Sequence, residues 1–407
     1  MPKTIKCGCG KDHEVPDVKI VWKVNSAKNI VEFFKDSLLV ADKSTAKLVK
    51  PSEDFFVFEQ SRILASMENV EKLLKVAKDY PSLVSIGSGS ITDVVRYAAY
   101  LLKKPFSAFP TAPSVDGYTS SVAPLLVNNI KKTLPAKTPT VILIDLEILK
   151  NAPIDLLKAG IGDIAAKVTA RLDWMVANKL LDEGICDFTW ENLKDYLVDV
   201  LKNPNRILDR DEISIKSLME GLLVSGLNIA TVGHSRPASG AEHVISHFIE
   251  MYHEFHGEYP PFHGITVAMG TFITLKAYEV LMNNVKLQQK RIPLDYKKEK
   301  LKTLFNTEIA DEFCKIYETK RRAEKINLRE IVKTIKPVYQ EYSKSAFEAL
   351  SQISVHEFFN RYDKDFLKQV IILTNMTRDR YNILDVLDQL DLLESFAEWV
   401  IEEQLNF

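Results

Sequence analysis

The first 150 residues alternate short apolar runs with amphipathic stretches, and this alternation constrains the fold more than any other feature. Apolar runs bounded by turn residues are typical of buried strands, whereas apolar residues spaced by three and four are typical of helices. The expected strands are residues 37–42, 55–60, 82–87, 106–110 and 140–145. Stretches such as SMENVEKLLKVAKDY and ITDVVRYAAYLLKK lie between them. The pattern predicts an α/β Rossmann-like domain with a mostly parallel sheet and helices on its faces.

From about residue 150 onward the sequence shows helical periodicity and almost no strand-like runs. Because 407 residues exceed what one hydrophobic core usually supports, we expect two domains. We place an α/β domain at residues 1–150 and an all-helical domain at residues 151–407.

Composition restricts the kinds of partner that the chain can bind and the cellular compartment in which it is expected. The 53 Lys and Arg residues nearly balance the 55 Asp and Glu residues, and the net charge of -2 argues against a nucleic-acid partner. Four cysteines form no disulfide framework, and the N-terminus does not resemble a secretion signal. No uninterrupted apolar run reaches the roughly eighteen residues of a membrane span. We expect a soluble, cytoplasmic protein without a membrane span.

Cys7 and Cys9, with His13 nearby, invite a metal interpretation. A structural zinc site normally takes four ligands from two separated pairs, and no second pair follows these cysteines. We therefore interpret the segment as a terminal turn with two ordinary thiols.

Two consecutive strand ends are rich in Gly, Ser and Thr. Gly87 and Gly89 lie where the strand at 82–87 turns into a helix, and the first N–H groups of that helix form an anion site. The stretch 109–125 follows the next strand, and ligands of parallel sheets lie outside the carboxyl ends of the strands. A nucleotide site is one interpretation; the other is that these residues serve only as turns and helix caps.

Histidines and one carboxylate mark the helical part of the chain. His243 and His247 are four residues apart on a predicted helix, so both imidazoles project from one face. His263 precedes another apolar helix, and Asp163 follows a glycine-containing turn. Two or three imidazoles with one carboxylate suit a divalent transition ion. A metal-free histidine-bearing helix, with Asp163 as an N-cap, is the alternative.

Four motifs carry a resemblance to a known family. GSGSITDVVRYAA, PTAPSVDGYTSSVAPL, AGIGDIAAKVTARLDW and GHSRPASGAEHVISHFIEM resemble segments of the glycerol-1-phosphate dehydrogenases, especially the bacterial branch. That family belongs to the group of iron-containing alcohol dehydrogenase, glycerol dehydrogenase and dehydroquinate synthase. The resemblance runs from about residue 37 to about residue 275, with a weaker echo at 378–387.

The resemblance implies the roles of individual residues. Asp163, His243 and His263 correspond to metal ligands, and His247 and Asp163 to catalytic residues. Asp116, Asp163 and His247 correspond to substrate contacts. The implied cofactor contacts are Asp42, Gly89, Ser90, Ile91, Thr92, Asp93, Thr111, Ala112, Pro113, Ser114 and Ser120.

The implied reaction is the reversible reduction of dihydroxyacetone phosphate to sn-glycerol 1-phosphate, with NADH or NADPH and one divalent ion such as zinc, nickel, cobalt or iron. The resemblance also implies a small-molecule substrate and a homo-oligomer, with a homodimer as the reasonable case.

Two alternatives stay open: a glycerol or other polyol dehydrogenase of the same group, and a non-redox protein that binds a nucleotide or a metal. The residue that binds the substrate phosphate is also open, with Arg236 and the pair Lys131 and Lys132 as candidates.

Overall fold

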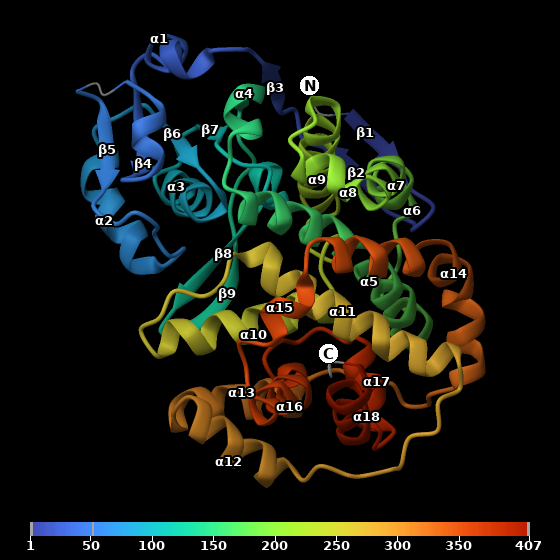
Figure 1. Cartoon of the computed structure of the whole chain (residues 1–407). Helices are drawn as coiled ribbons and strands as arrows, with labels where there is room; N and C mark the ends of the chain where they lie inside the picture. Colours follow the sequence, from blue (N-terminus) through green and yellow to red (C-terminus); the bar gives the residue numbers. More distant parts are fainter. Residues whose placement is uncertain (1–2, 51–52, 405–407) are drawn as a thin grey trace. The chain divides into compact units, whose positions relative to one another are not determined.

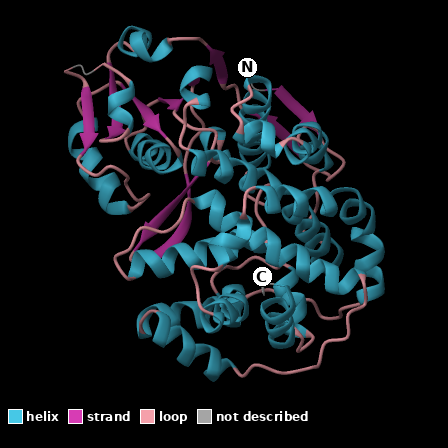
Figure 2. Ribbon diagram, in the orientation of Figure 1, coloured by secondary structure: helices cyan, strands magenta, loops and turns pink. Residues whose placement is uncertain are grey.

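A computed structural model describes residues 3–50 and 53–404 of the chain (Figures 1 and 2). The chain divides into two compact units. The first, here called the N-terminal unit, comprises Met1–Gly160 and Asp187–Ser235. The second, here called the helical unit, comprises Ile161–Cys186 and Arg236–Phe407.

A six-stranded parallel sheet forms the centre of the N-terminal unit. Its strand order is β3 (Lys19–Trp22), β10 (Val141–Ile144), β7 (Phe106–Pro110), β6 (Ser82–Gly87), β4 (Ser37–Asp42) and β5 (Phe55–Phe58). The predicted strands are confirmed, with β5 and β10 each two residues shorter than expected. The parallel sheet of the predicted fold class is therefore confirmed.

Alternation along the strands builds a core on each face of this sheet. Leu38 and Val40 of β4 belong to one core together with Val94 of α3 (Gly89–Leu101). Leu39 belongs to the other core together with Phe34. Successive side chains of a strand point to opposite faces, so a strand covered on both faces is apolar throughout. All six residues of β4 are indeed buried.

Further helices complete the N-terminal unit. They are α1 (Ile30–Phe33), α2 (Met67–Ala77), α4 (Leu146–Lys150), α6 (Asp187–Glu191), α7 (Lys194–Lys202), α8 (Pro204–Leu208), α9 (Glu212–Val232) and the short 3-10 helices η1 (Ser26–Asn29), η2 (Thr45–Leu48) and η3 (Asp116–Thr119).

The predicted division at residue 150 assigned the segment 187–235 to the second domain, whereas the structure places it in the N-terminal unit. Its helix α9 packs against η3: Thr119 Oγ1 donates a hydrogen bond of 2.7 Å to the Leu223 carbonyl. A Cβ atom on Gly226 would lie 2.2 Å from the Asp116 carbonyl oxygen, so only glycine permits this close approach. These contacts join a later part of the chain to the N-terminal unit.

Helix α5 (Ile154–Leu181) begins in the N-terminal unit and continues into the helical unit. The remaining helices of the helical unit are α10 (Ala241–Phe255), α11 (His263–Met282), α12 (Leu294–Leu304), α13 (Thr307–Thr319), α14 (Leu328–Gln352), α15 (Val355–Phe359), α16 (Lys364–Leu373), η4 (Thr374–Met376), α17 (Ile383–Gln389), α18 (Leu393–Trp399) and η5 (Val400–Gln404). The described residues of this unit contain no strand, and the predicted helical C-terminal region is confirmed.

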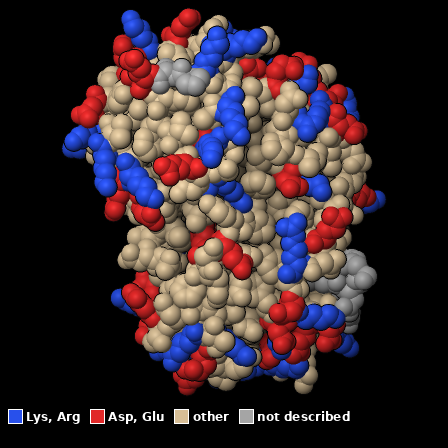
Figure 3. Space-filling view, turned by 60° about the vertical axis from the view of Figure 1, so that its left-hand side comes forward, with Lys and Arg blue, Asp and Glu red and all other residues tan. Residues whose placement is uncertain are grey.

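Two helices, α9 and α11, are long and apolar enough to cross a membrane by length and composition. Their apolar windows are 61% and 83% buried inside the protein, as is usual for core helices. Acidic and basic side chains are interspersed over the face drawn in Figure 3.

Candidate active site

Asp163 lies inside helix α5, where close packing against α11 requires glycine. A Cβ atom on Gly162 would lie 2.3 Å from the carbonyl oxygen of Gly264, next to His263 at the start of α11. Gly162 therefore lets the two helices approach each other beside Asp163. The alternative interpretation of Asp163 as an N-cap is wrong, because α5 already begins at Ile154.

His243 and His247 lie one turn apart on α10, with ring centroids 6.2 Å apart. The Nδ1 atom of His243 lies 2.9 Å from Glu242 Oε1. Because an ionised carboxylate only accepts hydrogen bonds, Nδ1 is the donor and Nε2 is left with its lone pair. His243 Nε2 lies 3.6 Å from Asp163 Oδ1, so the nitrogen that can bind a metal faces the carboxylate.

A second carboxylate holds His263 in the same way. Its Nδ1 atom lies 2.6 Å from Glu250 Oε1, which again leaves Nε2 as the metal-binding nitrogen. The same Glu250 oxygen accepts hydrogen bonds from Ser246 and Thr266. The His263 ring centroid lies 5.4 Å from that of His243 and 5.5 Å from that of His247.

Asp163 and the three histidines therefore lie together, as the sequence predicts, and we call them the metal group. Ligand atoms of His247, Glu250 and His263 also lie within 4.8 Å of one another, so the structure offers Glu250 as a rival oxygen ligand. Three hydrogen-bond donors already engage Glu250 Oε1. We therefore interpret Glu250 as the residue that orients His263 rather than as a ligand.

Lys167 gives the metal group an ion pair that the sequence did not indicate. Its Nζ atom lies 2.8 Å from Asp163 Oδ1, and both side chains are fully buried. Burial alone would raise the pKa of Asp163, but Lys167 and the two histidines outweigh it and hold the pKa below its ordinary value. Asp163 is therefore an ionised donor, and a carboxylate with imidazole nitrogens suits a divalent transition ion.

Two half-buried arginines near the metal group, Arg378 and Arg380, also escaped the analysis of the sequence. Arg378 Nη2 lies 2.8 Å from His247 Nδ1, and Arg380 donates to the Ser239 carbonyl. Burial lowers the pKa of Arg378 to about 10 and that of Arg380 to about 9, so both stay positively charged at neutral pH. The only indication of them in the sequence was the weak similarity to the family at residues 378–387.

The other basic candidates have different surroundings. Arg236 donates two hydrogen bonds to the carboxylate of Glu183 and one to the Tyr381 carbonyl, an arrangement typical of a structural residue. Lys131 and Lys132 lie on β9 (Ile130–Pro135) of the N-terminal unit. His253 contacts Glu258 and Tyr362.

In the N-terminal unit, the predicted cofactor loops lie side by side at the carboxyl ends of β6 and β7. Gly87 pairs with Pro110, and the Thr111 N–H donates to the Gly87 carbonyl. A helix follows this strand, as predicted, and it begins at Gly89. Ser114 is buried, and its side chain hydrogen-bonds to Tyr118, whose hydroxyl donates to the Ala112 carbonyl over 2.7 Å. The place of these loops, outside the carboxyl ends of two neighbouring parallel strands, fits a bound cofactor.

The acidic residues of these loops make defined contacts. Asp42, at the end of β4, accepts hydrogen bonds from the N–H groups of Ser44 and Thr45. Asp116 accepts one from Ser225. Asp93 is paired with the buried Arg96; burial raises its pKa to about 7 although the guanidinium opposes the shift.

Ser120 accepts a hydrogen bond from the N–H of Val122 and follows η3 directly. The remaining predicted cofactor residues lie in the first turn of α3, at 89–93, and in the loop 111–114.

The chain is similar in sequence to several known proteins. Residues 34–153 match the family model described as iron-containing alcohol dehydrogenase. Glycerol-1-phosphate dehydrogenase [NAD(P)+] of Bacillus velezensis is 37% identical over 62% of this chain and 64% of its own length. The enzyme of the same name from Halalkalibacterium halodurans is 33% identical over 67% and 74%. That of Sulfurisphaera tokodaii is 34% identical over 65% and 75%.

Solved structures share the fold at low identity. Sulfoacetaldehyde reductase from Bifidobacterium kashiwanohense, in complex with NAD+, aligns with a TM-score of 0.61 and 14% identity over 95% of this chain and 98% of its own. A probable glycerol dehydrogenase from Sinorhizobium meliloti 1021 aligns with a TM-score of 0.55 and 19% identity over 84% and 100%.

Proposed function

The chain belongs to the glycerol-1-phosphate dehydrogenase family, a family of NAD(P)-dependent oxidoreductases, and we propose that it reversibly reduces dihydroxyacetone phosphate to sn-glycerol 1-phosphate. The aligned region spans 64% of the Bacillus velezensis relative and 74% of the Halalkalibacterium halodurans relative. The observation that carries the proposal is that two half-buried arginines lie near the metal group, because a metal donor set and a site for an anionic substrate then occur together.

Asp163, His243 and His263 would hold the divalent ion, with Glu242 and Glu250 orienting the two imidazoles. Such an ion supplies Lewis-acid polarisation of a substrate oxygen, and NADH or NADPH supplies the hydride. The cofactor would bind at the first turn of α3 (89–93) and the loop 111–114, with Asp42 and Ser120, and Asp116 would contact the substrate. Zinc, nickel, cobalt and iron all suit an Asp and His donor set.

His247 would transfer the proton in this reaction. A guanidinium only donates hydrogen bonds, so Arg378 requires the His247 Nδ1 atom to be the acceptor. The neutral imidazole then carries one proton, on Nε2, and it must be an imidazolium to act as an acid. Nδ1 would take up a proton from solvent when Arg378 turns to the substrate phosphate, and Nε2 would then give its proton to the oxygen on C2, which leaves a neutral imidazole protonated on Nδ1. In the reverse direction the same Nε2 atom would accept the proton.

Arg378 and Arg380 would bind the substrate phosphate. Both are half-buried cations, and Arg378 lies next to the proposed proton donor. Guanidinium groups bind phosphate through paired hydrogen bonds. Arg236 already pairs with Glu183, so we assign it a structural role. Lys131 and Lys132 remain the alternative, with the N-terminal unit supplying the phosphate contact.

The test is oxidation of NADH and of NADPH by the metal-loaded protein with dihydroxyacetone phosphate and with dihydroxyacetone. We expect turnover of the phosphate ester and a product with the sn-1 configuration. Turnover of dihydroxyacetone alone would make the protein a polyol dehydrogenase. Absence of binding to both cofactors would favour a non-redox member of the group. Sedimentation of the same sample checks the expected homodimer, and fractionation of cells checks the expected cytosolic location.

A further inference from the structure

The N-terminal hairpin brings two cysteines and a histidine together, and these residues take no part in the proposed reaction. Strands β1 (Lys3–Lys6) and β2 (Asp12–Val15) pair in antiparallel register, with Ile5 opposite His13. Cys7 and Cys9 lie in the turn between the strands. Cys9 Sγ lies 3.1 Å from His13 Nε2, and the Cys9 N–H donates to Cys7 Sγ over 3.5 Å.

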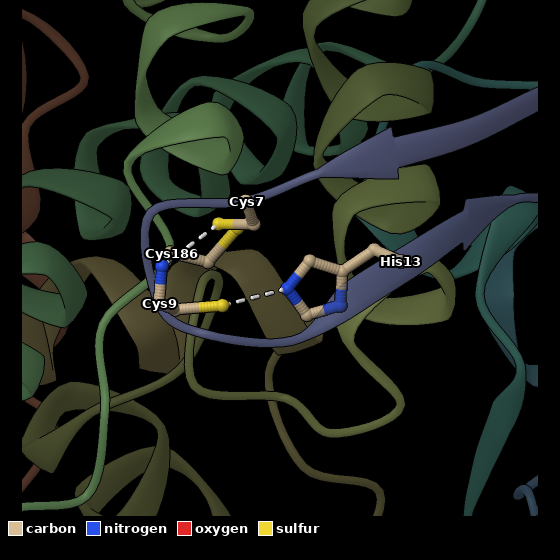
Figure 4. Close-up of side chains that lie close together, drawn as sticks. All are labelled: Cys7, Cys9, His13 and Cys186. Carbon is tan, nitrogen blue, oxygen red and sulfur yellow. Dashed lines mark hydrogen bonds between the residues drawn. The ribbon is translucent and has the colours of Figure 1, made fainter.

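A third cysteine, distant in sequence, reaches the same place. Cys186 is the residue directly before Asp187, where the chain enters helix α6. Ligand atoms of Cys7, Cys9, His13 and Cys186 all lie within 4.8 Å of one another. Figure 4 shows the three sulfur atoms and the His13 ring turned toward one another. The structure holds all four cysteines of the chain as thiols, with no disulfide.

We propose that Cys7, Cys9, His13 and Cys186 form a structural zinc site, here called the Cys3His site. Zinc binds three thiolates and one imidazole in closed, four-coordinate structural sites. A tetrahedron with zinc–sulfur bonds of about 2.3 Å has sulfur–sulfur edges of about 3.8 Å, so ligand atoms within 4.8 Å need only a small contraction. Thiolates are softer ligands than the carboxylate and imidazoles of the metal group, so the two sites differ in the metals that they favour.

The hairpin gives such a site a structural purpose. A two-stranded hairpin is only marginally stable alone, and most residues from Thr4 to Lys11 are exposed or half-buried. His13 and Cys186, by contrast, are 8% and 2% exposed. One ion bound by all four side chains would fasten the hairpin to the connection that leads into α6. It would leave no coordination position for a substrate.

The sequence could not reveal this site, because its fourth ligand is not part of a second pair. The interpretation of the segment as a turn with ordinary thiols relied on the absence of such a pair. Cys186 replaces it through the path of the chain, which brings the α5–α6 connection beside the hairpin.

The test measures zinc in the full-length protein purified without chelator under reducing conditions. We expect Cys186→Ser and His13→Ala each to lose one zinc ion per chain relative to wild type. Cys314→Ser, a change of a buried cysteine on α13 outside the site, should lose none. His13→Cys should keep the ion, since four thiolates also bind zinc. Equal zinc content in wild type, Cys186→Ser and His13→Ala would overturn the proposal.

A second measurement on the wild type alone covers the case in which the variants do not fold. The protein is loaded with cobalt(II) in place of zinc, and its absorption spectrum is recorded before and after alkylation of the thiols. We expect an intense thiolate-to-cobalt charge-transfer band that alkylation abolishes, because the metal group contains no sulfur ligand. A cobalt spectrum without this band would contradict the Cys3His site and leave the proposed reductase activity untouched.

Discussion

Glu242 and Glu250 each hold one imidazole of the metal group through its Nδ1 atom, at 2.9 and 2.6 Å. Removing such an orienting carboxylate typically costs about 10- to 100-fold in metal affinity or activity. We expect Glu242→Gln and Glu250→Gln to weaken metal binding by this amount, measured by competition with a chelator. Asp163→Asn should weaken it more, because it removes a ligand.

Glu258→Gln is the matched control, since that exposed carboxylate contacts His253 outside the metal group. Its metal affinity should equal that of wild type. A loss in Glu250→Gln larger than in Asp163→Asn would make Glu250 the oxygen ligand and contradict our assignment.

Arg378 provides the residue-scale test of substrate binding. A hydrogen bond to a charged group contributes about 1.5–3 kcal/mol, which corresponds to roughly 10- to 100-fold in affinity. We expect Arg378→Met to raise the KM for dihydroxyacetone phosphate by about that factor, measured in steady-state kinetics. Arg236→Met should lower the melting temperature instead, because it leaves Glu183 without its guanidinium. An unchanged KM in Arg378→Met would exclude this arginine from the phosphate site.

Among the elements, α5 and α11 depend on one glycine contact to bring Asp163 near His263. A Cβ atom on Gly162 would lie 2.3 Å from the Gly264 carbonyl oxygen, so Gly162→Ala must push the helices apart. Overpacking of this kind costs typically about 1–3 kcal/mol. We expect that loss in denaturant unfolding, together with weaker metal binding. The control is Ile213→Ala, a change of an exposed side chain on α9 that should alter neither quantity. Wild-type metal affinity in Gly162→Ala would contradict the role of this contact.

The elements also show which part of the fold the sequence encodes locally. The five predicted strands were found because each carries a short, mostly apolar run between turn residues. Four of them, β4, β6, β7 and β10, are almost fully buried, which favours such a pattern. The hairpin of β8 (Val122–Val127) and β9 was missed, although Asn128 and Asn129 both have positive φ, as its two-residue turn requires. Strand β3 was missed because half-exposed edge residues give a weak pattern.

At the scale of the whole molecule, contacts between distant segments were the least predictable feature. The segment 187–235 follows a stretch of the helical unit yet belongs to the N-terminal unit, where its helix α9 packs against η3 with Gly226 at a point of close approach. The four-residue spacing of His243 and His247 predicted their shared helix face. The proximity of Asp163 came only from the family resemblance, since no local rule relates residues on different helices.

Metal binding should also increase the free energy of unfolding of the whole protein. An ion that binds only the folded chain adds about 2.7 kcal/mol to the free energy of unfolding at a concentration 100 times its Kd. We expect this increase on adding metal to stripped protein, followed by urea unfolding. Asp163→Asn should retain only the part that the Cys3His site contributes. An equal increase in Asp163→Asn and wild type would place the stabilising ion elsewhere.

The central claim is that reduction of dihydroxyacetone phosphate depends on an ion held by Asp163, His243 and His263. The most direct measurement is the rate of NAD(P)H oxidation with this substrate in chelator-stripped wild type as metal is added back. We predict a rate near zero in stripped protein that rises in proportion to the ion bound in wild type but not in Asp163→Asn. Full turnover by the stripped protein would contradict the account.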